Sequence, residues 1–204
     1  MKNQVQSNAS IGDKYLNKHY QHVSNPEAGF SLLELMAVVL IIAIMAVITM
    51  PLLQAQVAAR EIDSIARRFI AHAHFARQLA LYRGESVTLS PLADHSWEGG
   101  WVTQSGCVAR KSPIQCSARQ WLSHGHIYPV YFKLGGKQFI DPHSGKRGIL
   151  FNAAGAAKTA QGGFVANRLV LGHATHVGLE RHLILGSGGR WRICDPTLDA
   201  KRCH

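Results

Sequence analysis

Hydrophobic residues gather in one long segment near the N-terminus of the chain. From residue 35 to residue 53 the sequence is apolar, with Thr49 and Pro51 as the only interruptions in type. As a helix, these 19 residues would extend about 28 Å, close to the thickness of the hydrocarbon core of a bilayer. The pattern therefore predicts a membrane-spanning helix.

The surroundings of this segment differ from those of a secretory signal peptide. The 29 residues before Phe30 are mostly polar, and no small-residue cleavage site follows the apolar segment. Glu34 lies at its front edge, where a carboxylate is costly unless it is paired or close to the interface. A plain signal anchor, which would hold the rest of the chain outside the cytoplasm, leaves Glu34 unexplained.

Beyond Pro51 the apolar positions recur at steps of three and four residues, the period of a helix with one buried face. The members of this face are Ala58, Ile62, Ile65, Phe69, Ala73, Ala76 and Ala80. The charged residues Arg60, Glu61, Arg67, Arg68 and Arg77 mostly take other faces. We expect this amphipathic helix to continue the membrane helix and to end near Tyr82, with Gly84 as its stop. A continuous helix from Ser31 to Tyr82 would contain 52 residues and extend about 78 Å.

After Gly84 the apolar runs become short and are separated by Gly, Pro, Asn or Ser, which predicts strands and turns. The candidate strands are residues 86–90, 100–104, 127–134, 148–152, 167–171, 182–185 and 190–194. The last two flank Gly-Ser-Gly-Gly at 186–189 and are expected to form a hairpin, whereas residues 153–163 resemble a loop. A long N-terminal helix packed on an antiparallel sheet belongs to the α+β class.

Composition and charge narrow the functional classes. The chain has 204 residues and a net charge of +10, so about 150 residues remain for one domain outside the membrane. Residues 142–204 hold nine lysines and arginines against three acids, a net of +6. A basic excess favours polyanions such as nucleic acid or anionic lipid, and a solvated basic surface without a partner is the alternative.

The arginines of the predicted hairpin are the strongest candidates for a binding site. In a strand, Arg190 and Arg192 would share one face and Trp191 would take the other. Their guanidinium groups would lie about 7 Å apart, similar to successive phosphates along a nucleic-acid strand. Alternatively, both arginines pair with Asp195, Asp199 or backbone carbonyls on an edge strand.

Four cysteines occur, and they allow three pairings. We favour Cys107–Cys116 and Cys194–Cys203, because each pair is nine residues apart and would close a loop containing Gly, Pro or Ser. An exported chain meets an oxidising compartment, where disulfides form. Zinc is a weak alternative, since no C-x-x-C is present.

Twelve histidines raise the question of a metal or catalytic site. The close pairs are His72 and His74, His124 and His126, and His173 and His176. We interpret these as ordinary histidines, because no G-x-S-x-G, phosphate loop or H-E-x-x-H is present. We expect no catalysis, no metal and no cofactor.

The segment Gly29-Phe30-Ser31-Leu32-Leu33-Glu34 and the apolar run after it resemble the class III signal of type IV prepilins and type II secretion pseudopilins. In that family a prepilin peptidase cuts after the glycine and N-methylates the new first residue. The resemblance implies a leader of residues 1–29, cleavage between Gly29 and Phe30, and methylation of Phe30. It also implies that Glu34 neutralises the α-amino group of Phe30 in a neighbouring subunit, and Pro51 matches the family's helix-kinking proline.

The resemblance further implies a domain order and a location. Residues 30–56 would form the transmembrane and filament-core helix, and residues 57–204 a periplasmic head. The protein would reside in the bacterial inner membrane as a single-pass protein and then assemble into a pilus or pseudopilus. Its partners would be other major and minor pilins or pseudopilins.

Two further patterns resemble the GspH/FimT group of minor pilins and pseudopilins. Trp97-Glu98-Gly99-Gly100-Trp101 is similar to the Trp-x-x-Gly-Trp pattern of the group, and Gly-Arg-x-Arg at 189–192, before a cysteine-bracketed tail, resembles the FimT branch. FimT-like pilins are implicated in DNA binding during natural transformation. The resemblance assigns Arg190 and Arg192 as contacts and Gly189 as the turn residue, and we add Lys201 and Arg202 from their charge.

The sequence therefore predicts a minor type IV pilin that binds DNA for uptake. Two alternatives remain: a minor pilin that primes pilus assembly without DNA, and a GspH-like pseudopilin of a type II secretion system. Residues 105–126, which include the first cysteine pair, match no pattern of the group.

Overall fold

A computed structural model of the chain describes residues 29–93, 96–106, 119–135, 139–141, 145–159, 163–186 and 188–203. The predicted pair Cys107–Cys116 lies outside the described residues. The chain divides into two units, Met1–Ala46 and Val47–His204. The helix α1 (Leu32–Arg83) begins in the first unit and ends in the second.

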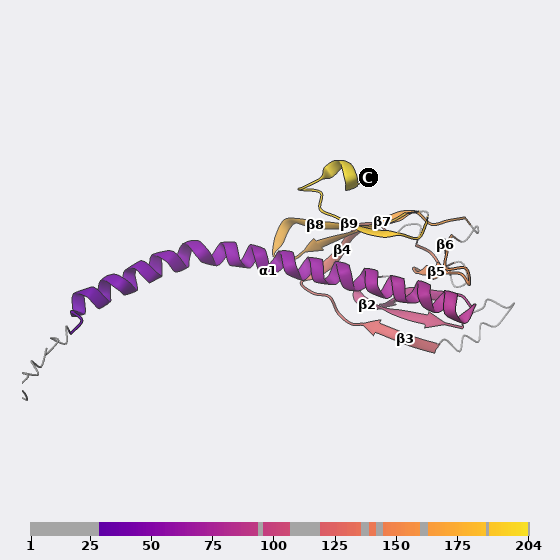
Figure 1. Ribbon diagram of the computed structural model, residues 1–204, viewed down its shortest axis with the longest axis horizontal. Helices are drawn as coiled ribbons and strands as arrows, with labels where there is room; N and C mark the ends of the chain where they lie inside the picture. Colours follow the sequence, from indigo (N-terminus) through magenta and orange to yellow (C-terminus); the bar gives the residue numbers. More distant parts are fainter. Residues whose placement is uncertain are drawn as a thin grey trace, which may run out of the picture. The chain divides into compact units, whose positions relative to one another are not determined.

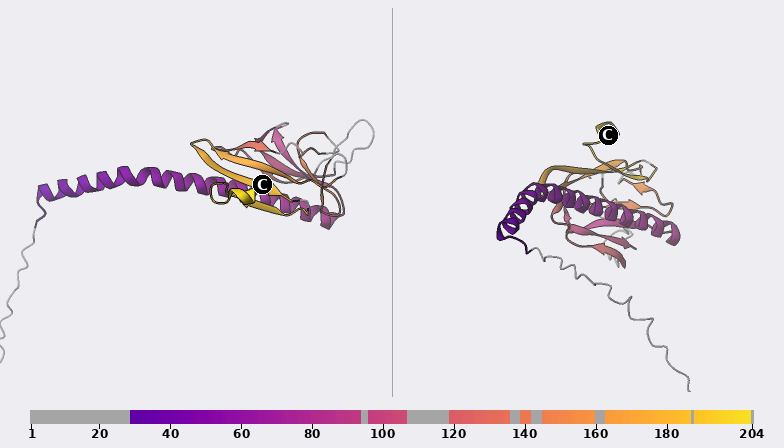
Figure 2. Two further views of the ribbon diagram at one scale, coloured as in Figure 1. Left: turned by 90° about the horizontal axis from the view of Figure 1, so that it is seen from above. Right: turned by 60° about the vertical axis from the view of Figure 1, so that its left-hand side comes forward.

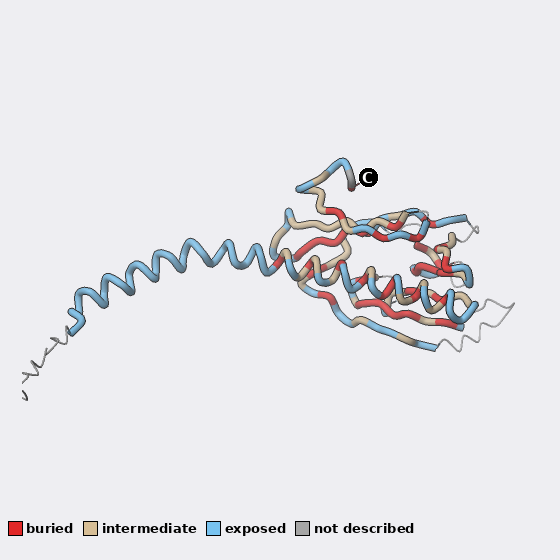
Figure 3. Tube along the Cα trace, viewed as in Figure 1, coloured by how far each residue is buried: buried red, intermediate tan, exposed pale blue. Residues whose placement is uncertain are grey.

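In the first unit the described residues are the start of α1 and the three residues before it. Gly29 and Phe30 precede the helix, and Ser31 caps it: its carbonyl accepts the Leu35 N–H at 3.2 Å and its hydroxyl the Leu33 N–H at 3.3 Å. Glu34 lies in the first turn, where the helix dipole favours a carboxylate. Among the described residues, α1 is the one helix long and apolar enough to cross a membrane, and its apolar part is exposed throughout (Figure 3).

The second unit is a helix packed on two antiparallel sheets (Figure 1 and Figure 2). The strands are β1 (Val87–Ala93), β2 (Ser96–Ser105), β3 (Arg119–His124), β4 (Val130–Gly135), β5 (Ile149–Phe151), β6 (Ala157–Lys158), β7 (Asn167–His173), β8 (His176–Leu185) and β9 (Trp191–Cys194). One sheet has the order β3-β2-β1-β5-β6 and the other β4-β7-β8-β9. A short helix η1 (Ala200–Cys203) follows β9.

Phe69 of α1 joins the two sheets. Its ring is fully buried and meets Trp97 and Trp101 of β2 edge-on, with centroids 5.4 and 5.0 Å away. On the side of the other sheet it meets Phe132 of β4 at 5.6 Å and Trp191 of β9 at 5.7 Å. Such pairs contribute about 0.5–1.5 kcal/mol each beyond the area that they bury. One helical side chain therefore helps to fix the position of both sheets.

The helical period predicted from the sequence is confirmed. Ala58, Ile62, Phe69, Ala73, Ala76 and Ala80 are buried, Ile65 is half-buried, and Ala66 and His72 join the buried face. The helix ends at Arg83, and Gly84 follows with a φ of +64° and donates its N–H to the Ala80 carbonyl at 3.0 Å. Glycine adopts this left-handed conformation without steric cost, which is why it stops the helix here.

The strand predictions were partly wrong. The single predicted sheet is two sheets, and β3 was missed because its mostly exposed edge residues show no apolar alternation. The two-residue strand β6 lies inside the predicted loop 153–163. The predicted strand 127–134 begins later, at Val130, after a turn in which Val130 donates its N–H to the Ile127 carbonyl at 2.9 Å.

A histidine lies in the core beside Phe69. The indole N–H of Trp101 donates to Nδ1 of His72 at 3.0 Å, so Nδ1 must be unprotonated. Burial lowers the pKa of His72, and the nearby His124 and Arg68 lower it further. Burial and Arg68 likewise lower the pKa of His124. The folded head therefore disfavours protonation of both rings.

Acidification should consequently destabilise the head. Unfolded histidines, with a pKa of about 6.5, take up protons that folded His72 and His124 resist. We expect the free energy of unfolding of residues 57–204 to be constant above about pH 7.5 and to fall toward about pH 5, by at most about 1.4 kcal/mol per pH unit for each histidine. Urea unfolding at a series of pH values measures it. His72→Gln keeps an acceptor for Trp101 but cannot be protonated, so the free energy of unfolding of this variant should depend less on pH. The same pH dependence in the variant and the parent would contradict the role given to His72.

Candidate nucleic-acid interface

The C-terminal hairpin predicted from the sequence is confirmed. Strands β8 and β9 pair with Leu185 opposite Trp191 and Leu183 opposite Ile193. In the turn, Gly186 donates its N–H to the Arg190 carbonyl at 3.0 Å, and Gly189 donates to the Gly186 carbonyl at 2.9 Å. Gly189 has a φ of +76°, which a residue with a side chain rarely adopts. In the described part of the sheet, β9 is one of two edge strands, and β4 is the other.

The hairpin directs its arginines outward. Trp191 is buried and its ring lies 5.7 Å from that of Phe69, whereas Arg190 and Arg192 are exposed on either side of it in the sequence. Because side chains alternate along a strand, an inward tryptophan places both neighbours on the outer face. The predicted alternation is therefore present.

A third arginine belongs to the same face. The register places Arg168 of β7 opposite Ile184 of β8, and Ile184 opposite Arg192 of β9. Residues opposite one another in an antiparallel pair share a face, and two strand spacings separate the backbones of Arg168 and Arg192 by about 10 Å. We call Arg168, Arg190 and Arg192 the arginine face. The sequence analysis missed Arg168, because its place depends on a strand register that no local pattern reveals.

Arg77 of α1 contacts the turn of the hairpin. Its Nη1 donates to the carbonyl oxygen of Gly189 at 3.4 Å. A Cβ atom at Gly189 would lie 3.4 Å from Cζ of Arg77, in ordinary van der Waals contact, so the positive φ rather than a lack of space favours glycine here. The sequence analysis placed Arg77 on an outer face of the helix and did not connect it with the hairpin.

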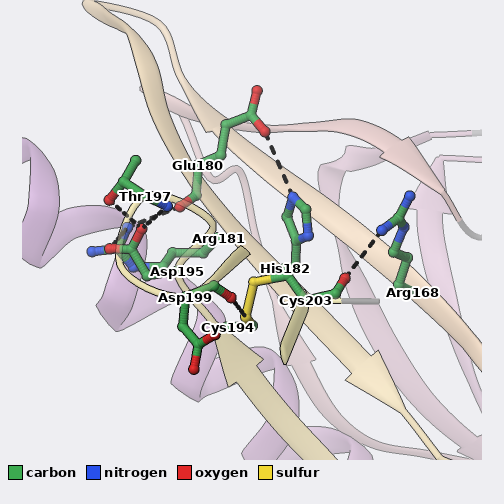
Figure 4. The surroundings of a disulfide bond; sticks show 9 residues. All are labelled: Arg168, Glu180, Arg181, His182, Cys194, Asp195, Thr197, Asp199 and Cys203. Carbon is green, nitrogen blue, oxygen red and sulfur yellow. Dashed lines mark hydrogen bonds and ion pairs between the residues drawn. A yellow bond between two sulfur atoms is a disulfide. The ribbon is translucent and has the colours of Figure 1, made fainter. Parts of the chain in front are cut away.

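The tail after β9 is tied back to the sheet at Cys203 (Figure 4). The predicted disulfide between Cys194 and Cys203 is present, with their Cα atoms 5.5 Å apart. Nη1 of Arg168 also donates to the carbonyl oxygen of Cys203 at 3.1 Å. Lys201 is exposed on η1, and Arg202 follows it in the same short helix. Both predicted basic tail residues are thus on a segment held at Cys203.

Two carboxylates near the hairpin, Asp195 and Glu180, pair with side chains other than the hairpin arginines (Figure 4). Asp195 pairs with Arg181 at 2.8 Å. Burial alone would raise the pKa of Asp195, but hydrogen bonds from the Thr197 hydroxyl and N–H and the charge of Arg181 outweigh it and lower the pKa. Glu180 has a lowered pKa because of its hydrogen bond with Lys133, and its carboxylate also lies 3.6 Å from His182.

The histidine pairs do not assemble a metal site in the part of the chain that the structure describes, where no group of three potential ligands is found. His173 is buried, and its Nε2 lies 2.8 Å from a carboxylate oxygen of Glu61 in α1. Its Nδ1 lies 3.1 Å from the Thr175 hydroxyl. This pair connects the helix with β7, and the sequence analysis did not predict it.

Two family models match the chain. "Type II transport protein GspH" matches residues 66–201, and "Prokaryotic N-terminal methylation motif" matches residues 24–50. Among curated proteins, none matches the sequence significantly.

Solved structures with a similar fold include two pilus-related proteins. The type IV minor pilin FimU of Pseudomonas aeruginosa is 15% identical with a TM-score of 0.49, over 68% of this chain and 91% of that chain. The minor pseudopilin EpsH of the Type 2 Secretion System of Vibrio cholerae is 9% identical with a TM-score of 0.46, over 67% of this chain and 98% of that chain. Because the GspH model matches more than half of the sequence, behind an N-terminal methylation motif, the chain belongs to the GspH family of minor type IV pilins and pseudopilins.

Proposed function

We propose that this minor pilin binds DNA without sequence preference through its C-terminal hairpin and serves DNA uptake in natural transformation. The observation that supports this most is the exposure of Arg190 and Arg192 on both sides of the buried Trp191. Two arginines about 7 Å apart match the spacing of phosphates along one strand of DNA. Arg168 extends the positive surface on the face of Arg192, and Lys201 and Arg202 add two charges in the tail.

The N-terminal segment would display this surface. A prepilin peptidase would remove residues 1–29 by cutting between Gly29 and Phe30 and would methylate Phe30. Both residues precede the helix, so α1 need not unwind for the cut. The apolar part of α1 would first hold the protein in the inner membrane with its head in the periplasm. In the filament, Glu34 would pair with the amino group of Phe30 in a neighbouring pilin.

Contacts of this kind are directed at phosphates and carry no information about base sequence. Each head offers only a few charges, so a single subunit would bind weakly and lose affinity steeply as salt is raised. Several basic subunits in one filament would act together through their effective concentration.

A second candidate function comes from the description of the matching family model, which is that of a type II transport protein. The protein would not need to bind DNA as a pseudopilin of a type II secretion system. The same holds for a minor pilin that only primes assembly. DNA binding by the isolated head therefore discriminates between these functions.

Replacing the hairpin arginines should weaken DNA binding and its salt dependence. Each phosphate contact contributes about 0.9 to the slope of log K against log salt, so Arg190→Ala with Arg192→Ala should lower the slope by about 1.8. Fluorescence anisotropy with a labelled short duplex, from about 50 to about 200 mM salt, measures it on residues 57–204. This fragment contains every residue of the described core.

A matched control removes the same charge elsewhere on the head. Arg60→Ala with Arg67→Ala takes two exposed arginines from α1 and should leave the slope nearly unchanged. An equal loss in both double variants would show that only net charge matters. If the parent head does not bind DNA even at about 50 mM salt, the assembly or secretion function is favoured.

The disulfide should contribute to both stability and binding. Closing a loop of about ten residues stabilises a fold by about 2–3 kcal/mol, so Cys194→Ser with Cys203→Ser should lower the free energy of unfolding by that amount. Urea unfolding measures it, and DNA affinity should also fall because Lys201 and Arg202 are no longer held at the sheet. Cys203→Ser alone should cost as much as the double variant. Unchanged stability and affinity would mean that the tail has no role.

A further inference from the structure

A second basic surface lies on the helix, remote in sequence from the hairpin. Along the head part of α1, one face is exposed at intervals of three and four residues, which is the spacing of neighbours on a helix surface. We call this surface the α1 stripe. Its members are Arg60, Ser64, Arg67, Arg68, Ala71 and His74.

The stripe is positive because both acids in this part of the helix pair with residues of the sheet. Between residues 58 and 83 the acids are Glu61 and Asp63. Glu61 pairs with His173 at 2.8 Å, and Asp63 accepts a hydrogen bond from Nε of Arg181 at 2.7 Å. Each carboxylate therefore has a cationic or protonatable partner in the head, while the Glu61 and Asp63 side chains remain 44% and 38% exposed.

The other two arginines of this part of the helix have partners within the head. Arg77 donates to the Gly189 carbonyl, and Arg83 pairs with Glu85. For the three arginines of the stripe, no ion pair is found within the described ranges. The stripe therefore presents three exposed positive charges and no negative one.

The composition of the surface favours a protein partner over DNA. Exposed apolar residues flank the stripe, with Val57 54% exposed at one end and Leu81 and Tyr82 51% and 88% exposed at the other. Arginine beside tyrosine and aliphatic residues is typical of protein interfaces. Arg60 and Arg67 are seven residues apart, or about 10.5 Å along the axis, which is wider than the phosphate spacing and equal to the repeat of a packed partner helix.

The charge also selects among possible subunits. Two copies of this chain packed through their stripes would place arginines against arginines, which costs free energy in a partly dehydrated interface. A helix that carries aspartate or glutamate at seven-residue intervals would instead pair with Arg60 and Arg67. We propose that the α1 stripe docks against an acidic helix of a different pilin subunit, so that this chain joins a filament beside an acidic neighbour rather than a copy of itself. The proposal goes beyond DNA binding and does not depend on it.

Site-directed photocrosslinking of the full chain in its own cells tests this proposal. A photoreactive amino acid replaces Ala71, at the centre of the stripe, and a second variant carries it at Val177 of β8, which is 81% exposed, as the control. We expect a crosslink from position 71 to a helix of another pilin, within two turns of Asp or Glu, identified by mass spectrometry. A homodimer, a DNA or lipid adduct, or no product at position 71 would overturn the proposal.

Charge exchange then tests the chemistry of the contact. Arg67→Glu with Arg68→Glu should reduce the crosslink at least tenfold, and Arg67→Lys with Arg68→Lys should retain most of it. Replacing the acidic residues next to the crosslink in the partner with lysine should restore the crosslink in the Arg67→Glu, Arg68→Glu variant. Because Arg68 lowers the pKa of His72 and His124, unfolding is compared above about pH 7.5, where both rings are neutral and the free energy of unfolding should be unaffected. The DNA affinity of the hairpin should remain near that of a variant with the same net charge. A crosslink insensitive to charge reversal would contradict the proposal, whatever the outcome for DNA.

Discussion

The packing of Phe69 between two sheets is the interaction on which the rest of the head depends. Its ring meets aromatic side chains of β2 and β4 and, at the C-terminal end of the chain, Trp191 of β9. The inward position of Trp191 turns Arg190 and Arg192 to the outside, because side chains alternate along a strand. The same helical rotation that buries Phe69 exposes Arg67 and Arg68. A single packing arrangement thus orients both basic surfaces.

The positions of the acidic residues determine where positive charge remains on the surface of the head. Glu61 and Asp63 pair with His173 and Arg181, which connects α1 with the second sheet, and Asp195 pairs with the same Arg181. While these acids pair with other groups of the head, exposed arginines lie on two surfaces, the hairpin and the α1 stripe. The first has the spacing of phosphates and the second the spacing of a partner helix, so we propose different ligands for them.

Local patterns in the sequence predicted the features that depend on local geometry. The helical period, the stop at Gly84 and the alternation around Trp191 follow from steric rules that act within a few residues. The division into two sheets and the place of Arg168 depend on strand register, and the Glu61–His173 pair joins residues 112 positions apart. Strand β3 gave no signal, because a polar edge strand lacks the alternation that marks a half-buried one.

The central claim is that Trp191, held in the core by Phe69, orients an arginine surface toward DNA. The most direct measurement is an NMR titration of the isotopically labelled head, residues 57–204, with a short DNA duplex. The account predicts chemical-shift changes in the backbone amides of Gly189–Arg192 and η1 and in the side-chain N–H groups of Arg168, Arg190 and Arg192. The resonances of the α1 stripe should remain unchanged. Shifts confined to α1, or no shifts at all, would contradict the claim.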